Sequence, residues 1–152
     1  MATANDVVQD FIDQLDLKSR PDSLIVYLQP TSPFRESGMI DRGIEMSLAA
    51  SKPVVAISKV QQHPNKMLKI GENGEIQPYL RESDPTANRQ SLPNVHIPTG
   101  SLYVFSIYDF FVSSSIPIRG ALPLIVSGVY ALDIDDEIDL KIAQEIGNAN
   151  EF

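Results

Sequence analysis

Residues 24–35 read LIVYLQPTSPFR, an apolar run that ends abruptly in a polar loop with two prolines. The apolar run has the composition of a buried β-strand. Pro30 and Pro33 hold the backbone φ angle at about −65° and remove two amide donors, so the loop after the strand is stiff. The polar residues held at the carboxyl end of this strand are Gln29, Thr31, Ser32 and Arg35. Because ligands bind at that end in open α/β sheets, the segment predicts a binding site.

Helical and strand patterns alternate around this segment. A helix is expected over residues 6–15, where apolar residues recur on one face, with Asn5 or Asp6 as its N-cap. A second helix fits residues 37–50, and a short buried strand fits residues 54–57. This order of helices and strands indicates an α/β fold with a parallel sheet.

The pattern changes at about residue 59. Residues 66–70 and 76–79 resemble a hairpin closed by an Asn-Gly turn, and residues 81–94 are polar and punctuated by prolines, as in a loop. Strand and helix patterns resume later in the chain, at residues 102–105, 107–112, 122–126 and 137–147. The simplest organisation is an α/β core of residues 1–58 and 121–149, interrupted by a β-rich insertion at residues 59–120.

Composition limits the classes of function. The chain has 152 residues, 43% of them hydrophobic and 21% charged, as in one ordinary globular domain. Its net charge of −8 argues against non-specific binding to nucleic acid. The apolar runs are far shorter than the roughly 20 residues that span a bilayer, so no membrane partner is expected. Without cysteine there are no disulfides or thiolate metal sites, which suits a cytoplasmic protein.

Two carboxylates near the C-terminus are candidate metal ligands. Asp133 and Asp135 alternate in an expected strand at residues 132–135, so both side chains are predicted to point to one face. Two carboxylates at that spacing can share a hard divalent cation, which for a phosphate substrate is Mg²⁺. Acidic residues also gather at helix N-termini, and Asp136 is the expected N-cap of the last helix. Composition alone favours the capping interpretation over the metal site.

Other polar residues allow both a site and a plain structural role. Lys66 and Arg89 could each pair with a carboxylate or a phosphate, although an isolated basic residue is usually only solvated. Gly100, between Thr99 and Ser101, could let a ligand approach the backbone, but such a glycine more often makes a turn. The sequence contains no nucleophile elbow, Walker motif or glycine-rich dinucleotide fingerprint.

Four segments resemble, in order, the motifs of the acylneuraminate (CMP-sialic acid) cytidylyltransferases. The family motifs are Leu-Gln-Pro-Thr-Ser-Pro-Leu/Phe-Arg, His-Pro-x-Lys, Arg-Gln-x-Leu-Pro followed by Asn-Gly-Ala-Ile-Tyr, and Asp-Ile-Asp-Thr-x-x-Asp-Leu. The corresponding segments here are Leu28 to Arg35, His63 to Lys66, Arg89 to Pro93 followed by Pro98 to Tyr103, and Asp133 to Leu140. One such motif is weak, but the ordered set across residues 3–146 is specific.

The resemblance implies an incomplete Rossmann-like nucleotidyltransferase sheet with a β-rich dimerisation insertion. In the family, the anomeric hydroxyl of an acidic nine-carbon sugar (eight-carbon in the related KDO enzymes) attacks the α-phosphate of CTP, giving the CMP-sugar and pyrophosphate. By resemblance, Asp133 and Asp135 are catalytic and hold Mg²⁺. The nucleotide- and sugar-binding positions are Gln29, Lys66, Arg89, Thr99 and Tyr103. The implied partners are CTP, an acidic sugar and a second copy of the chain.

Two departures from the family pattern stand out. Thr99 occupies the position of the usual Asn, so the sugar specificity is expected to differ. The family's opening segment, Ile-Pro-Ala-Arg-x-Gly-Ser-Lys-Gly, binds the CTP phosphates and has no counterpart here, where residues 2–8 already resemble its Asp-Thr-Ala stretch and following helix. We therefore expect the C-terminal part of a cytidylyltransferase, N-terminally truncated relative to the family and with little activity alone. The alternatives are a non-catalytic remnant that dimerises or binds acidic sugar, and a nucleotide-sugar transferase with a different substrate.

Overall fold

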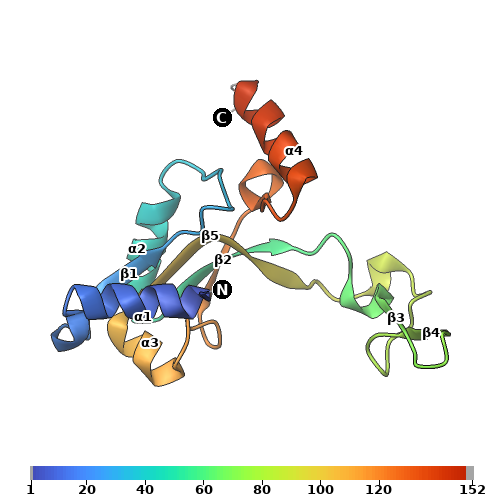
Figure 1. Ribbon diagram of the computed structural model, residues 1–152, viewed down its shortest axis with the longest axis horizontal. Coiled ribbons are helices and arrows are strands. Elements are labelled where there is room, and N and C mark those ends of the chain that lie inside the picture. Colours follow the sequence, from blue (N-terminus) through green and yellow to red (C-terminus); the bar gives the residue numbers. More distant parts are fainter. Residues whose placement is uncertain (1, 150–152) are drawn as a thin grey trace. The chain divides into compact units, whose positions relative to one another are not determined.

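The computed structural model describes residues 2–149 (Figure 1). The chain divides into two compact units. The core unit comprises Met1–Ser58 and Pro98–Phe152, and the insertion unit comprises Lys59–Ile97. Each unit is considered by itself below.

The core unit is built on a four-stranded sheet with the strand order β1-β5-β2-β6. The strands are β1 (Leu24–Tyr27), β5 (His96–Ser106), β2 (Val54–Lys59) and β6 (Leu122–Ile125). β1 pairs antiparallel with β5, whereas β2 pairs parallel with β6. The predicted α/β class is confirmed, but the sheet is mixed rather than parallel because β5 runs against β1. Since β1 lies at an edge of the sheet, Ile25 is its one buried residue.

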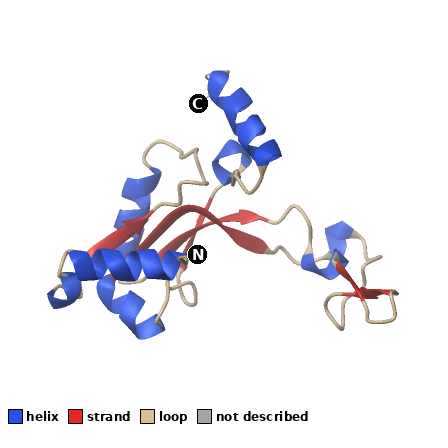
Figure 2. Cartoon of the chain, viewed as in Figure 1, coloured by secondary structure: helices blue, strands red, loops and turns tan. Residues whose placement is uncertain are grey.

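Helices cover both faces of this sheet (Figure 2). They are α1 (Ala4–Gln14), α2 (Met39–Ala50), α3 (Ile107–Ser113) and α4 (Glu137–Asn148), with short 3-10 turns at Leu17–Ser19, Pro64–Lys66, Arg89–Ser91 and Gly128–Ala131. Alternate residues of β5 point to opposite faces. Tyr103 and Phe105 pack in one cluster with residues of α1 and α3, and Leu102 and Val104 pack in another with α2. None of the described helices is long and apolar enough to cross a membrane.

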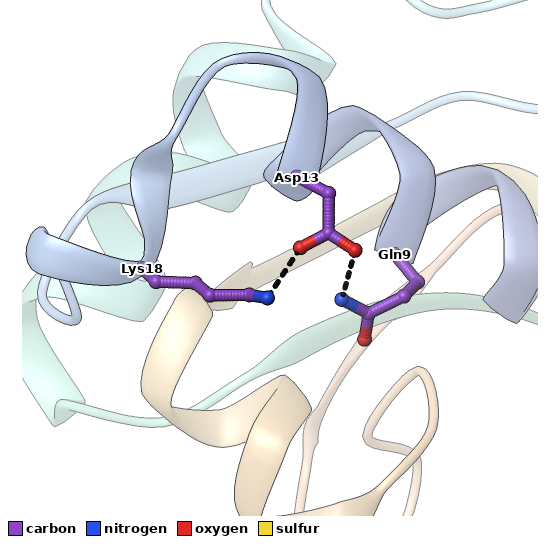
Figure 3. Close-up of polar contacts among 3 residues, drawn as sticks. All are labelled: Gln9, Asp13 and Lys18. Carbon is purple, nitrogen blue, oxygen red and sulfur yellow. Dashed lines mark hydrogen bonds and ion pairs between the residues drawn. The ribbon is translucent and has the colours of Figure 1, made fainter.

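The first helix begins earlier than its pattern predicts. Thr3 is the N-cap of α1, and its hydroxyl accepts a hydrogen bond from the Asp6 amide (3.2 Å) while the Asp6 carboxylate accepts one from the Thr3 amide (2.7 Å). The prediction of Asn5 or Asp6 as N-cap is therefore wrong, because Asp6 is the third helical residue of a capping box. Near the other end of α1, Asp13 accepts from Gln9 (3.0 Å) and pairs with Lys18 (2.7 Å), as Figure 3 shows.

The segment before the last helix also differs from its prediction. Residues 132–135 form no strand, and the amide of Ile134 donates to the carbonyl of Thr31 (2.8 Å). Asp136 is the N-cap of α4, as predicted, and its carboxylate accepts from the amides of Ile138 (2.7 Å) and Asp139 (3.0 Å). Asp136 and Asp139 thus serve the helix start, whereas Asp133 and Asp135 do not accept from its amides.

The insertion unit contains the predicted hairpin, formed by β3 (Leu68–Ile70) and β4 (Ile76–Pro78) in antiparallel pairing. Gly74 lies in its turn with φ of +80°, a conformation that favours glycine. The unit ends at Ile97, whereas the sequence predicts an insertion that continues to residue 120. Residues 98–120 instead belong to the core unit, because β5 pairs with β1 and α3 packs into the core.

Candidate functional site

The loop after β1 is bonded directly to β5. Three hydrogen bonds join the two segments. They run from the Gln29 amide to the Gly100 carbonyl (3.0 Å), from the Ser32 hydroxyl to the Thr99 carbonyl (2.7 Å) and from Arg35 Nε to the Ser101 carbonyl (2.9 Å). Residues separated by more than sixty positions in the sequence therefore form one rigid surface at the carboxyl end of β1.

Gly100 allows this close approach. Its φ is +75°, and a Cβ built at this position would collide with Oε1 of Gln29 and lie 2.7 Å from the hydroxyl of Ser32. The Gln29 side chain therefore lies directly against the backbone of β5. Of the two interpretations that the sequence allows for this glycine, the structure shows close approach, although here the approaching group is a side chain of the same protein.

The hydroxyls beneath the loop are occupied by other protein atoms. Thr99 and Ser101 are buried, and their hydroxyl oxygens lie 2.7 Å apart. The Thr99 hydroxyl also donates to the carbonyl of Ala56 in β2 (3.4 Å). Thr99, a predicted binding position, thus lies in the floor of the site with its side chain directed into the sheet.

Tyr103 and Asp133 lie beside the same loop. The Ser32 hydroxyl is 3.4 Å from Oδ1 of Asp133. Burial raises the pKa of Tyr103, and the charge of Asp133 and the phenol of Tyr27 raise it further. The rings of Tyr27 and Tyr103 are 6.0 Å apart, centre to centre. Tyr103 therefore stays protonated near neutral pH and keeps its O–H donor next to a carboxylate.

The predicted metal ligands are only partly supported by their surroundings. Asp133 is half-buried and Asp135 is exposed, in a segment without regular secondary structure. The strand argument for placing both on one face is therefore wrong. Within residues 2–149, no group of three or more His, Asp or Glu side chains is arranged to hold a metal. Two carboxylates nonetheless fit Mg²⁺ when substrate phosphates and water supply the other oxygens, which is how this ion is usually bound.

Lys66 and Arg89 lie in the insertion unit, apart in the contact map from the residues of the loop after β1. The Lys66 ammonium donates to the Pro85 carbonyl (3.4 Å), and Nη2 of Arg89 donates to the Gln61 carbonyl (2.7 Å). His63 is buried and bonded through both ring nitrogens, to the Asn65 amide and the Pro93 carbonyl (3.1 Å each). The His-Pro-x-Lys segment is thus a local structural turn that carries Lys66.

Ser32 and Arg35 are functional candidates that the motif comparison does not single out. Ser32 is fully buried and contacts both β5 and Asp133, and Arg35 bonds the two ends of the loop to one another and to β5. Their signal in the sequence is their place in the stiff loop, since a small polar residue between two prolines has few ways to turn outward.

Comparisons with known proteins agree with this picture. No family model matches the chain. CMP-N,N'-diacetyllegionaminic acid synthase from Legionella pneumophila subsp. pneumophila is 25% identical over 153 aligned residues, which cover 97% of this chain and 65% of that protein. N-acylneuraminate cytidylyltransferase from Escherichia coli O18:K1:H7 is 25% identical over 117 residues, which cover 76% of this chain and 28% of that protein.

Among solved structures, the fold is similar to that of 4-diphosphocytidyl-2C-methyl-D-erythritolsynthase from Anaerococcus prevotii. The TM-score is 0.58 at 14% identity, and the match covers 97% of this chain and 68% of that one. This likeness shows a nucleotidyltransferase-type α/β fold. The chain spans 65% and 28% of the lengths of its two curated relatives. The chain is thus similar over nearly its whole length to cytidylyltransferases of the acylneuraminate type, which confirms the resemblance that its ordered motifs predict.

Proposed function

We propose that this chain forms part of a cytidylyltransferase that transfers CMP from CTP to an acylneuraminate-like acidic sugar and releases pyrophosphate. The observation that carries the proposal is the rigid surface at the carboxyl end of β1, where Gln29, Ser32 and Gly100 meet Asp133. Its support from sequence is the similarity to two proteins whose names describe this chemistry. The family's CTP-phosphate segment has no counterpart in these residues, so we propose that the chain acts as the C-terminal part of the enzyme.

In the proposed reaction, the anomeric oxygen of the sugar forms a bond to the α-phosphorus of CTP. The bond from that phosphorus to the oxygen bridging to the β-phosphate breaks, and pyrophosphate leaves. Asp133 and Asp135 would hold Mg²⁺, which when bound neutralises charge on the phosphates. The fixed Gln29 amide would orient the nucleotide or the sugar, and the protonated Tyr103 would donate a hydrogen bond to the acidic sugar.

The basic residues of the insertion unit suit the carboxylate of an acidic sugar. The described contacts of Arg89 use Nη2 alone, and a guanidinium has five N–H donors in a planar fork that matches a carboxylate. Lys66 is half-buried and makes one contact of 3.4 Å, so its ammonium keeps donors for a ligand. We propose that both residues bind the acidic sugar.

We also propose that the chain forms a homodimer through the insertion unit. Within residues 59–97, His63 is the one buried residue, so this unit has no apolar core of its own. Its exposed apolar side chains are Met67, Leu68, Ile70, Ile76, Tyr79, Leu80 and Ile97. A lone two-stranded hairpin is marginally stable in water, and a second copy would cover this apolar surface.

The proposal is tested by measuring CMP-sugar formation and pyrophosphate release with CTP, Mg²⁺ and N-acetylneuraminate. The purified 152-residue chain is assayed alone and together with a polypeptide that carries the family's CTP-phosphate segment. We expect turnover in the mixture and little or none from the chain alone. Asp133→Ala should abolish turnover in the mixture by removing a metal ligand, and surviving activity with unchanged Mg²⁺ dependence would refute that role.

Two results would contradict the proposal as a whole. Robust turnover by the chain alone would show that it is not a partial site. No turnover in the mixture, together with sugar binding measured by saturation-transfer NMR, would instead favour the non-catalytic remnant that binds acidic sugar.

A further inference from the structure

Arg35 uses its charge in an unusual way for an arginine at the rim of a site. Nε donates to the carbonyl of Ser101 and Nη2 donates to the carbonyl of Gln29, both at 2.9 Å. The ion pairs among residues 2–149 are Lys18–Asp13 and Arg42–Glu36, so Arg35 pairs with no carboxylate there. Its guanidinium instead joins the end of β1 to β5 through two backbone oxygens.

These bonds act on Gln29 from the side opposite its amide. The Gln29 amide donates to the Gly100 carbonyl (3.0 Å), and the Gln29 carbonyl accepts from Arg35 (2.9 Å) and from the Ser32 amide (3.2 Å). Both backbone polar groups of Gln29 are therefore fixed. Its side chain also lies against Gly100, where no Cβ can be accommodated. The direction of the Gln29 amide group thus depends on the position of its own backbone, which Arg35 helps to hold.

The two bonds need the shape of a guanidinium. Nε and Nη2 lie on one edge of a rigid plane, so one side chain can reach two carbonyls in a fixed geometry. A lysine ammonium is a point charge on a flexible stem and does not reproduce that edge. Partial burial of Arg35 lowers its pKa, yet an arginine stays charged across the physiological range. The two hydrogen bonds are therefore charge-assisted.

We propose that Arg35 is a positioning residue, which clamps Gln29 to β5 so that the Gln29 amide group presents a fixed donor and acceptor to the ligand. The identity of the ligand rests on the proposed function, whereas the positioning of Gln29 does not. In this role Arg35 touches no substrate atom and acts through Gln29.

The test compares Arg35→Lys with Arg42→Lys in the full chain. Arg42 forms an exposed ion pair with Glu36 (2.6 Å) and offers the same substitution away from Gln29. The direct measurement is the ¹⁵N relaxation of the Gln29 side-chain amide, identified by its loss in Gln29→Leu. We expect this amide to be rigid in the wild type and in R42K but mobile in R35K. We also expect R35K to weaken binding of N-acetylneuraminate or CTP with Mg²⁺ by about tenfold, as for one charge-assisted hydrogen bond.

The relaxation measurement decides the proposal even when ligand binding fails. An amide that is as rigid in R35K as in the wild type would overturn the positioning role. If the wild type binds neither probe, the proposed function fails, and the mobility of the amide in R35K still supports or refutes the clamp. Should R35K not fold, Arg35→Gln takes its place, because glutamine keeps a planar amide that can donate to one of the two carbonyls.

Discussion

At the scale of single residues, Gly100 couples the backbone of β5 to the Gln29 side chain. We predict that Gly100→Ala lowers the free energy of unfolding by about 1–3 kcal/mol, because φ of +75° strains an L-residue and the new methyl meets Gln29 and Ser32. Urea unfolding measures the loss. Gly128→Ala is the matched control, since its φ is +60° and nothing lies within 4 Å of its Cβ. Equal losses in the two variants would show that strain alone, and not the contact with Gln29, makes glycine necessary.

Tyr103 gives a second prediction at this scale, for alkaline pH. Its pKa is raised in the folded state by burial and then by Asp133, so the folded chain holds the phenolic proton more tightly than the unfolded chain. The stabilisation is therefore complete below the unfolded pKa of about 10 and is lost as pH rises through the higher folded value. We expect Tyr103→Phe to flatten this alkaline fall in stability, measured by urea unfolding from pH 8 to about 11. The control is Tyr108→Phe, at an exposed tyrosine, and an unchanged alkaline slope in Y103F would contradict the assignment.

At the scale of elements, the hairpin of β3 and β4 has no apolar layer to rest on. All six of its strand residues are exposed, and Ile70 and Ile76 show 78% and 70% of their surface. We predict that Ile70→Lys shifts the chain from dimer to monomer in size-exclusion chromatography with light scattering, because a charge on the covered face is costly. Ile138→Lys in α4, where the side chain is 66% exposed, is the matched control. A dimer that persists in I70K but not in I138K would place the interface on the core unit.

At the scale of the core unit as a whole, the edge formed by β1 is unprotected. Its four residues carry no charge and no proline, and a shallow groove of about 140 Å³ runs beside it, lined by Ile25, Val26 and Tyr27 with Val7, Val8 and Phe11 of α1. Such edges associate with other strands. We predict that Phe11→Lys, at a half-exposed side chain, reduces concentration-dependent light scattering and changes the melting temperature little. Val112→Lys in α3 controls for the added charge, and an equal improvement there would show a general effect of charge.

Local patterns predict most of the helices and strands of this protein. The apolar periodicity of α2 and α4, the Asn-Gly turn of the hairpin and the cap at Asp136 depend on neighbours within a few residues, so the sequence carries them directly. Thr3 was missed as a cap because several residues in a row, Thr3, Asn5 and Asp6, can fill that role. The likeness to acylneuraminate cytidylyltransferases also followed from the sequence, since the order of short motifs survives at 25% identity.

Tertiary structure alone decided how these pieces form the candidate site. The antiparallel direction of β5, the edge position of β1 and the absence of a strand at residues 132–135 depend on pairing between distant segments. The contacts of Arg35 with Ser101 and of Ser32 with Thr99 join residues 66 and 67 positions apart. A residue's own sequence neighbourhood sets its local conformation but not the partner for its hydrogen bonds. That partner is chosen only when the sheet assembles and burial requires every polar group near the loop to be satisfied.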